Sequence, residues 1–253
     1  MGGRARVAGG GRLHCLSTNW QLCCVSPGDP APVEGWLDIG SPQSAASALS
    51  RAGRWSLDGN SRNFDAEDWW FRHSFDSPDL QLDHWVLGLD GIATISEVFL
   101  NGTLLLTSDN MFLAHEVRLE NALRPQGNEL QVVCRAAGAV LDGQRPRPKW
   151  RTPMVRHQQL RWLRTTLLGR TPGWSPPVAV VGPWRDVWLQ RRDRVNVESL
   201  RISATVKESQ GALSVAADVL PIGRQRISAV DCTLVRGTGR WVCRLGRTSG
   251  DSS

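Results

Sequence analysis

The stretch that decides the fold runs from residue 84 to residue 107. It reads His84-Trp-Val-Leu-Gly-Leu-Asp90, Gly91-Ile-Ala-Thr94, Ile95-Ser-Glu-Val-Phe-Leu100, Asn101-Gly102 and Thr103-Leu-Leu-Leu-Thr107. Two apolar runs that meet at an Asn-Gly pair are the strongest short hairpin signal, because both residues tolerate the positive φ of a type I′ turn. We therefore predict a strand over 84–90, followed by a β-hairpin over 95–107.

The same Asn101-Gly-Thr103 also spells an acceptor for N-glycosylation. We favour the turn, because the opening residues carry Arg4 and Arg6 but no apolar stretch of signal-peptide length follows them. We expect a cytoplasmic protein with a disordered N-terminus over 1–12.

Strand patterns continue on both sides of this hairpin. Residues 115–119 and 128–135 alternate polar and apolar with period two, and residues 186–190 read as a further strand. Helical character is limited to residues 44–51, which stop before Gly53. Many short strands with few helices predict an all-β chain with a jelly-roll β-sandwich.

A second series of strands begins after Arg194. Residues 195–202 and 212–220 have strand character, and three or four strands fit before the end rich in Gly, Arg and Ser. That number is too small to close a sandwich. We predict a jelly-roll domain over 13–192, an incomplete second sandwich over 193–236 and a disordered tail over 237–253.

Residues 140–183 interrupt the strand pattern. The segment holds seven prolines together with Trp150, Trp162 and Trp174. A stretch of this length without strand alternation inside a compact domain is usually functional. We therefore look here for a binding site.

The composition excludes several other classes of function. The net charge of +6 comes almost wholly from arginine, and the basic clusters at 145–151 and 191–194 form no repeated stripe along a helix. We expect no nucleic-acid partner. No segment approaches the roughly 20 consecutive apolar residues of a membrane helix, so we expect no membrane partner.

The six cysteines form no C-x-x-C pair and no set with zinc-ligand spacing. Cys23 and Cys134 lie among apolar strand residues, and we expect them to be small buried hydrophobes. We predict no metal and no cofactor.

Several blocks, taken in order, resemble family 2 glycoside hydrolases, in particular the β-mannosidase-like branch. Asp65-Ala-Glu-Asp-Trp-Trp-Phe-Arg72 followed by Phe75 resembles the family's Trp-Trp opening. Residues 87–94 with Glu97-Val-Phe-Leu-Asn-Gly102 resemble its strand pair, and Gly182-Pro-Trp-Arg-Asp-Val-Trp-Leu189 resembles its closing strand. The shared order from about residue 20 to residue 190 makes the resemblance specific.

The resemblance implies a galactose-binding-like jelly roll, an immunoglobulin-like sandwich that is incomplete here, and a (β/α)₈ barrel absent from this sequence. Such enzymes are retaining: one barrel carboxylate attacks the sugar, and the other acts as acid and then as base. Asn128-Glu129 matches the family's Asn-Glu dipeptide, but it starts an alternating strand, and the chain has no βα repeats. We assign no catalytic residue. We expect an N-terminal fragment that is inactive alone; the alternative is a stand-alone carbohydrate-binding module.

In β-mannosidases the jelly roll lends the sugar site a Gly-Trp-Asp-Trp-Gly loop, and the corresponding residues here are Gly173-Trp174-Ser175-Pro176-Pro177. Because this Asp is missing, the sequence does not identify which glycan the site takes. An indole suits a sugar platform, because pyranose C–H groups stack on its face; the alternative is that it is buried. The predicted sugar-binding residues are Trp174, Gly173, Trp150, Trp162 and Arg161, with Arg164 as a further donor. The expected partners are a β-linked glycoside or oligosaccharide and the barrel domain.

Overall fold

The computed structural model describes residues 13–79, 83–143, 151–155, 157–192, 195–222 and 226–247, with the single residues 146, 149 and 224. Strands dominate, and the helices are short. The residues form two compact units, of which one ends at Arg191 and the other begins at Arg192. The first unit holds a β-sandwich, and the second holds two β-hairpins.

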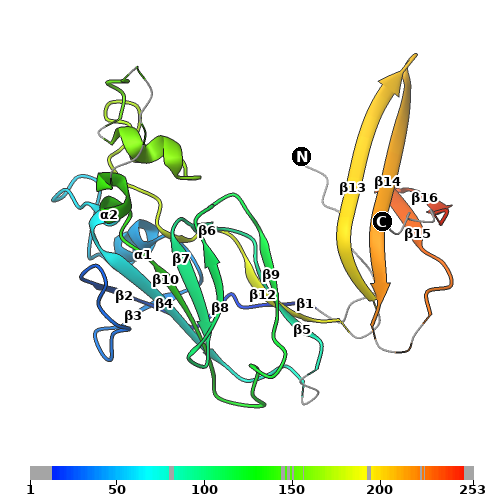
Figure 1. Cartoon of the computed structure of the whole chain (residues 1–253), viewed down its shortest axis with the longest axis horizontal. Coiled ribbons are helices and arrows are strands. Elements are labelled where there is room, and N and C mark those ends of the chain that lie inside the picture. The colour runs from blue at the N-terminus through cyan, green and yellow to red at the C-terminus, as the bar shows by residue number, and fades with distance from the viewer. Residues whose placement is uncertain are drawn as a thin grey trace. The chain divides into compact units, whose positions relative to one another are not determined.

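The sandwich consists of a four-stranded and a six-stranded sheet, both antiparallel (Figure 1). The four-stranded sheet has the order β1 (Leu13–Cys15), β12 (Val187–Arg191), β5 (Trp85–Leu89), β9 (His115–Arg118). The six-stranded sheet has the order β3 (Leu37–Gly40), β2 (Trp20–Val25), β4 (Asp68–Phe75), β10 (Asn128–Cys134), β7 (Ser96–Leu100), β8 (Thr103–Ser108). The predicted all-β sandwich is confirmed.

Alternate residues of these strands form the core between the two sheets. Trp69 and Phe71 of β4 and Leu130 of β10 point inward and are fully buried, as the pleat of a strand requires. Trp70 lies on the outer face of β4 and is still buried, because Phe99 stacks on it at 6.2 Å between ring centroids. Trp85 of β5 is buried as well.

The hairpin between β7 and β8 turns at Asn101 and Gly102, with φ of 52° and 82°. The Asn101 amide donates to the carbonyl of Ala122 at 2.8 Å and accepts from the backbone N–H of Glu129 at 2.9 Å. The predicted turn is confirmed, and the side chain of Asn101 belongs to it.

The predicted helix is α1 (Ala45–Arg51), and Ser44 caps it by accepting from the N–H of Ser47. Three further helical pieces escaped prediction because each is too short to show a helical period. They are η1 (Phe64–Ala66), α2 (Ala137–Asp142) and η2 (Gln158–Trp162). The short strands β6 (Ile92–Ala93) and β11 (Gly182–Pro183) pair with each other.

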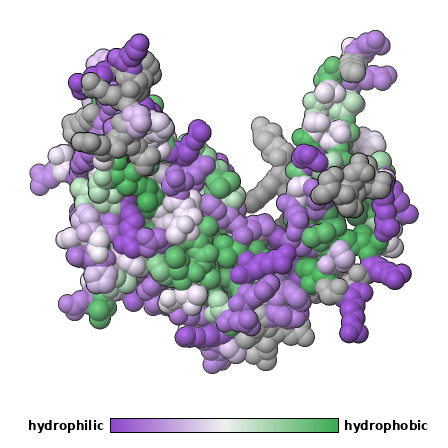
Figure 2. Space-filling view, in the orientation of Figure 1, coloured by the Kyte–Doolittle hydropathy of each residue, from purple (hydrophilic) through white to green (hydrophobic). Residues whose placement is uncertain are grey.

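The second unit pairs β13 (Val195–Lys207) with β14 (Gln210–Pro221), and β15 (Asp231–Arg236) with β16 (Gly239–Arg244). The prediction of a disordered tail over 237–253 is wrong for Gly239–Arg244, because a two-residue turn with Gly237 at φ 56° closes the last hairpin. The immunoglobulin-like assignment stays a prediction. Figure 2 shows green, apolar surface on these hairpins. The large apolar side chains exposed there include Ile202, Val206, Leu213, Val235, Trp241 and Val242.

Candidate functional site

The candidate site is built on residues 167–179, which we call the rim loop. Its backbone is folded by local turns: the N–H of Arg170 donates to the carbonyl of Leu167 at 2.9 Å, and that of Trp174 donates to Thr171 at 3.1 Å. The hydroxyl of Thr171, itself buried, also donates to Leu167 at 3.2 Å. The loop is therefore held largely by its own hydrogen bonds, although it contains no strand.

Gly169 is where the two ends of the rim loop meet. Its φ is +81°, and a Cβ at this position would lie 1.9 Å from the carbonyl oxygen of Val178. Only glycine combines this backbone conformation with so close an approach of another backbone segment. The N–H of Gly169 donates to the hydroxyl of Ser175 at 2.8 Å, which closes the loop on itself.

Arg170 anchors the rim loop to the sandwich. Its Nη2 and Nε atoms donate to the two carboxylate oxygens of Asp65 at 2.7 and 2.8 Å, and Nη1 donates to the carbonyl of Thr166 at 3.1 Å. The side chains of Arg170 and Asp65 are only 6% and 13% exposed. Such a bidentate arginine–carboxylate pair fixes the orientation of the two side chains as well as the distance between them. Asp65 belongs to the Trp-Trp motif, whereas no local pattern in the sequence marks Arg170 as its partner.

Trp174 lies on the outside of the loop, with 75% of its surface exposed. Gly173 precedes it with φ +82° and has no atom within 4 Å of the position of a Cβ. The exposure excludes the alternative that Trp174 is buried as a plug. An anchored loop therefore presents an indole face to solvent.

Ser175 stands where the resembling loop has Asp, and it faces back into its own loop. Its hydroxyl accepts from Gly169 and lies 3.5 Å from the hydroxyl of Thr171. The side chain that follows Trp174 thus stabilises the loop.

Behind the rim loop lies a cavity of about 260 Å³. Gly169, Arg170 and two prolines of the rim loop line one side, and residues 61–65 with parts of α2 and η2 line the rest. The cavity therefore brings the rim loop and η2, which carry most of the predicted sugar-binding residues, to the same region of the sandwich.

The other predicted residues lie outside this cavity lining. Trp162, at the end of η2, is 46% exposed. The exposed Arg161 donates from Nε to the carbonyl of Gln158 at 2.7 Å, so its guanidinium is held on its own helix. Arg164 is exposed, and its carbonyl accepts from the N–H of Met111. Trp150 lies outside the described residues.

The carboxylates of Asp68 and Glu97 share Arg135. Asp68 is buried and also accepts from the backbone N–H groups of Gly28 and Ala136, while Glu97 takes a two-pronged bond from Arg135. The hydrogen bonds that Arg135 donates, first to Glu97 and then to Asp68, raise the pKa of its guanidinium. These carboxylates are committed to holding the sheet together.

The Asn128-Glu129 dipeptide also has a structural role. Asn128 is buried. Its side-chain oxygen accepts from the N–H of Arg124 at 2.8 Å, and its side-chain nitrogen donates to the carbonyl of Arg124 at 2.7 Å. Glu129 accepts from Gln131 at 2.8 Å and lies 3.8 Å from Arg72. Glu129 lies on β10, as the alternating pattern of residues 128–135 predicts.

Burial raises the pKa of the Cys134 thiol. Cys134 is a buried hydrophobe as predicted, whereas Cys23 is only half-buried, because it lies near the edge of the sheet beside residues 34 and 35. Within the part of the chain that the structure describes, no cluster of three His, Cys, Asp or Glu residues is arranged to hold a metal ion. No helix in that part has the length and apolar character needed to cross a membrane.

Comparison with known proteins identifies the sandwich. The family described as "Glycosyl hydrolase 2 galactose-binding domain-like" matches residues 20–185. The chain is 35% identical over 133 residues to β-mannosidase B of Thermothelomyces thermophilus and 29% identical over 198 residues to β-mannosidase B of Emericella nidulans. These matches cover 48% and 70% of the chain but only 15% and 22% of the two relatives.

Solved structures share the fold. The β-D-mannosidase of Dictyoglomus thermophilum superposes with a TM-score of 0.65 at 20% identity, over 92% of this chain and 29% of that protein. A β-glucuronidase of Bacteroides uniformis gives 0.55 at 15% identity, over 92% and 26%. The chain therefore belongs to the galactose-binding-like domains of glycosyl hydrolase family 2 and is homologous to the N-terminal region of β-mannosidase B.

Proposed function

We propose that this chain supplies the non-catalytic rim of the sugar site in a β-mannosidase-like glycoside hydrolase. The observation that carries the proposal is the exposed indole of Trp174, on a loop that Arg170 and Asp65 hold against the sandwich. Gly173 and Trp174 match the loop that contacts sugar in the resembling enzymes.

The chemistry of cleavage belongs to a part of the enzyme outside this chain. A retaining glycosidase needs two carboxyl groups about 5 Å apart, one as nucleophile and one as acid and then base. Asp68, Glu97 and Glu129 are engaged with arginine and backbone partners instead. The chain's own task is to bind and orient the sugar ring, and a pre-ordered loop does so at low entropic cost.

The rim sets only part of the specificity. Trp174 recognises the C–H face that many pyranoses share. Ser175 is turned into the loop, so the sugar hydroxyl met by Asp in the resembling loop receives no such contact here. The substrate class that fits best is a β-linked glycoside, with the choice of sugar made by the remaining walls of the site.

A sugar titration of the isolated chain tests whether the rim loop binds sugar. Titration with methyl β-D-mannopyranoside, followed by tryptophan fluorescence, is expected to show weak, millimolar binding. Trp174→Ala should weaken it about fivefold, which corresponds to about 1 kcal/mol of stacking. Trp241→Ala is the matched control, since Trp241 is also exposed but lies on β16 in the second unit. If the parent chain and Trp174→Ala bind the sugar with equal affinity, Trp174 does not contact sugar and the proposed rim is wrong.

Hydrolysis separates this proposal from one in which the chain is itself an enzyme. We expect the isolated chain to leave 4-nitrophenyl β-D-mannopyranoside intact, because Asp68, Glu97 and Glu129 are engaged by arginine and backbone groups and are not held as a nucleophile and an acid. Turnover that survives purification to constant specific activity would contradict this assignment.

A further inference from the structure

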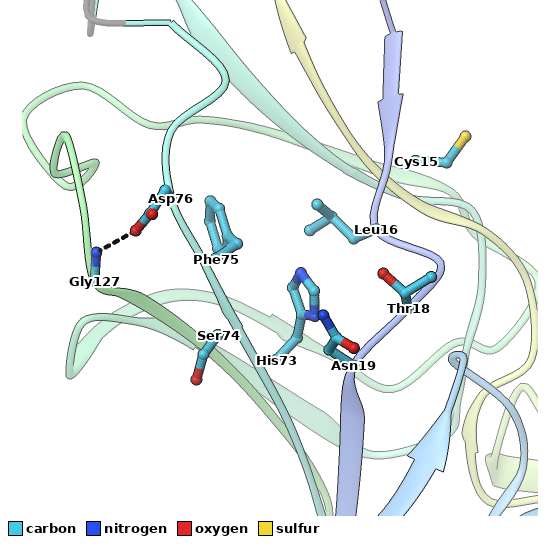
Figure 3. A pocket seen from close by; sticks show the side chains of 9 residues that line it. All are labelled: Cys15, Leu16, Thr18, Asn19, His73, Ser74, Phe75, Asp76 and Gly127. Atoms are coloured by element: carbon cyan, nitrogen blue, oxygen red, sulfur yellow. Dashed lines mark hydrogen bonds between the residues drawn. The ribbon is translucent and has the colours of Figure 1, made fainter.

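A second concave surface lies at the other end of β4 (Figure 3), and we call it the β4-end hollow. Its volume is about 500 Å³, and its lining comes from β1, the turn before β2, the end of β4 and Gly127. The Asp65 anchor of the rim loop precedes β4, whereas the hollow lies at residues 73–76. Eight strand residues span roughly 23 Å, so the two sites are well separated.

A ladder of stacked rings forms the wall of the hollow. The ring of Trp20 in the core stacks on His73 at 5.3 Å, and His73 stacks on Phe75 at 5.5 Å with only 12° between the ring planes. His73 is 5% exposed, and Phe75 is half-buried. Because each ring is supported by the one behind it, Phe75 is a fixed apolar surface at the edge of the hollow.

Polar groups surround this apolar wall. Thr18 and Asn19 are exposed beside the ring of Phe75, whereas Ser74, which precedes Phe75 in the strand, points to the opposite face of β4 (Figure 3). The carboxylate of Asp76 accepts from the N–H of Gly127 at 2.9 Å, which fixes its direction while engaging one of its two oxygens. The hollow thus offers hydroxyl, amide and carboxylate groups beside an aromatic ring.

The charge of the hollow selects the kind of ligand. None of its described lining residues is Lys or Arg. Burial lowers the pKa of His73 and outweighs the carbonyls of Asn19 and Thr18, which act in the opposite direction, so the imidazole is neutral at pH 7. Since Asp76 is the one carboxylate among the described lining residues, the hollow disfavours phosphates and uronates and suits a neutral molecule rich in hydroxyl groups.

We propose that the β4-end hollow is a second carbohydrate-binding site, which takes a neutral sugar ring against Phe75 and bonds its hydroxyls through Thr18, Asn19 and Asp76. Amphipathic sugars fit such a surface, because one ring face is lined by C–H groups and the rim carries hydroxyls. The site is complete within this chain and does not depend on Trp174.

The experiment uses the full chain and follows the ring protons of His73 by NMR. Methyl β-D-mannopyranoside, methyl β-D-glucopyranoside and methyl β-D-galactopyranoside are the neutral probes, and methyl β-D-glucuronide is the charged one. At least one neutral sugar should shift the His73 signals with a millimolar midpoint, and the glucuronide should bind at least about fivefold more weakly. Absence of any shift up to about 50 mM, or equal binding of the charged and neutral sugars, would overturn the site.

Two variants locate the binding. Asn19→Gly removes an amide while allowing the φ of 58° at this position, and Asp76→Asn removes charge while keeping an acceptor for Gly127. Each should weaken binding several-fold. Asn121→Gly is the matched control, since Asn121 is exposed with φ 62° outside the hollow, and Trp174→Ala should also leave the His73 shift unchanged. If binding survives in Asn19→Gly and Asp76→Asn, with melting temperatures unchanged, the hollow is not the site. If only Trp174→Ala matters, the rim loop accounts for all binding.

Discussion

The guanidinium of Arg170 pairs with both oxygens of the Asp65 carboxylate, although 105 residues separate the two in sequence. This contact joins the rim loop to the segment that leads into β4. The position of Trp174 therefore depends on an ion pair that does not itself contact the solvent-exposed ring.

The first prediction concerns that pair. Arg170→Met leaves the buried Asp65 carboxylate without its partner, which should lower the free energy of unfolding by about 3 to 5 kcal/mol. The double variant Arg170→Met, Asp65→Leu should recover much of the loss, because no buried charge remains unpaired. Urea unfolding measures both.

Arg244→Met is the control for this cycle. This substitution breaks the solvent-exposed Arg244–Asp231 pair. The urea midpoint of Arg244→Met should therefore match that of the parent chain. An Arg170→Met midpoint close to that of Arg244→Met would show that the buried pair does not hold the loop.

The second prediction separates close packing from backbone conformation at two glycines of the rim loop. Gly169→Ala places a Cβ against the backbone of Val178, so the loop must open, and we expect a loss of at least about 3 kcal/mol. Gly173→Ala meets the same positive φ in open space and should cost only about 1 to 2 kcal/mol. Thermal melts compare the two, and equal costs would refute the close contact.

Local signals predicted part of this structure. The turn at Asn101-Gly102 and the helix capped by Ser44 depend on neighbouring residues, so the sequence alone revealed them. The anchor of the rim loop and the β4-end hollow join distant segments, and no local pattern marks such contacts. β16 was missed because a short hairpin in a region rich in Gly and Arg resembles a disordered tail by composition.

The third prediction follows from the inward direction of Ser175. Ser175→Ala removes the oxygen that accepts from the N–H of Gly169, which should cost about 1 kcal/mol and speed hydrogen exchange at the Gly169 amide. Ser175→Thr keeps the hydroxyl and should retain the slow exchange. If Ser175→Ala leaves the exchange unchanged, the loop is closed by other contacts.

The fourth prediction concerns the exposed apolar side chains of the second unit. Ile202→Lys and Val235→Lys replace apolar surface by charge on β13 and β15, and they should reduce self-association measured by light scattering. Thr205→Lys adds the same charge at an exposed polar position of β13 and serves as the control. Equal scattering from Ile202→Lys and Thr205→Lys would assign the effect to charge alone.

The fifth prediction is a loss of stability in mild acid that originates at His73. Burial lowers the pKa of His73 in the folded chain below its value of about 6.5 in the unfolded chain. Between these two pKa values the unfolded chain binds more protons, so the free energy of unfolding falls as the pH drops below about 6.5. His115, whose pKa is also lowered by burial, contributes with the same sign.

Replacing His73 by Gln removes its share of this slope, although the variant also loses the ring stacking on Trp20 and Phe75 at every pH. The informative quantity is therefore the change of the unfolding free energy between about pH 7 and pH 5, which should be smaller in His73→Gln than in the parent. An unaltered slope in His73→Gln would mean that the stacked imidazole takes up its proton as readily in the folded chain as in the unfolded one.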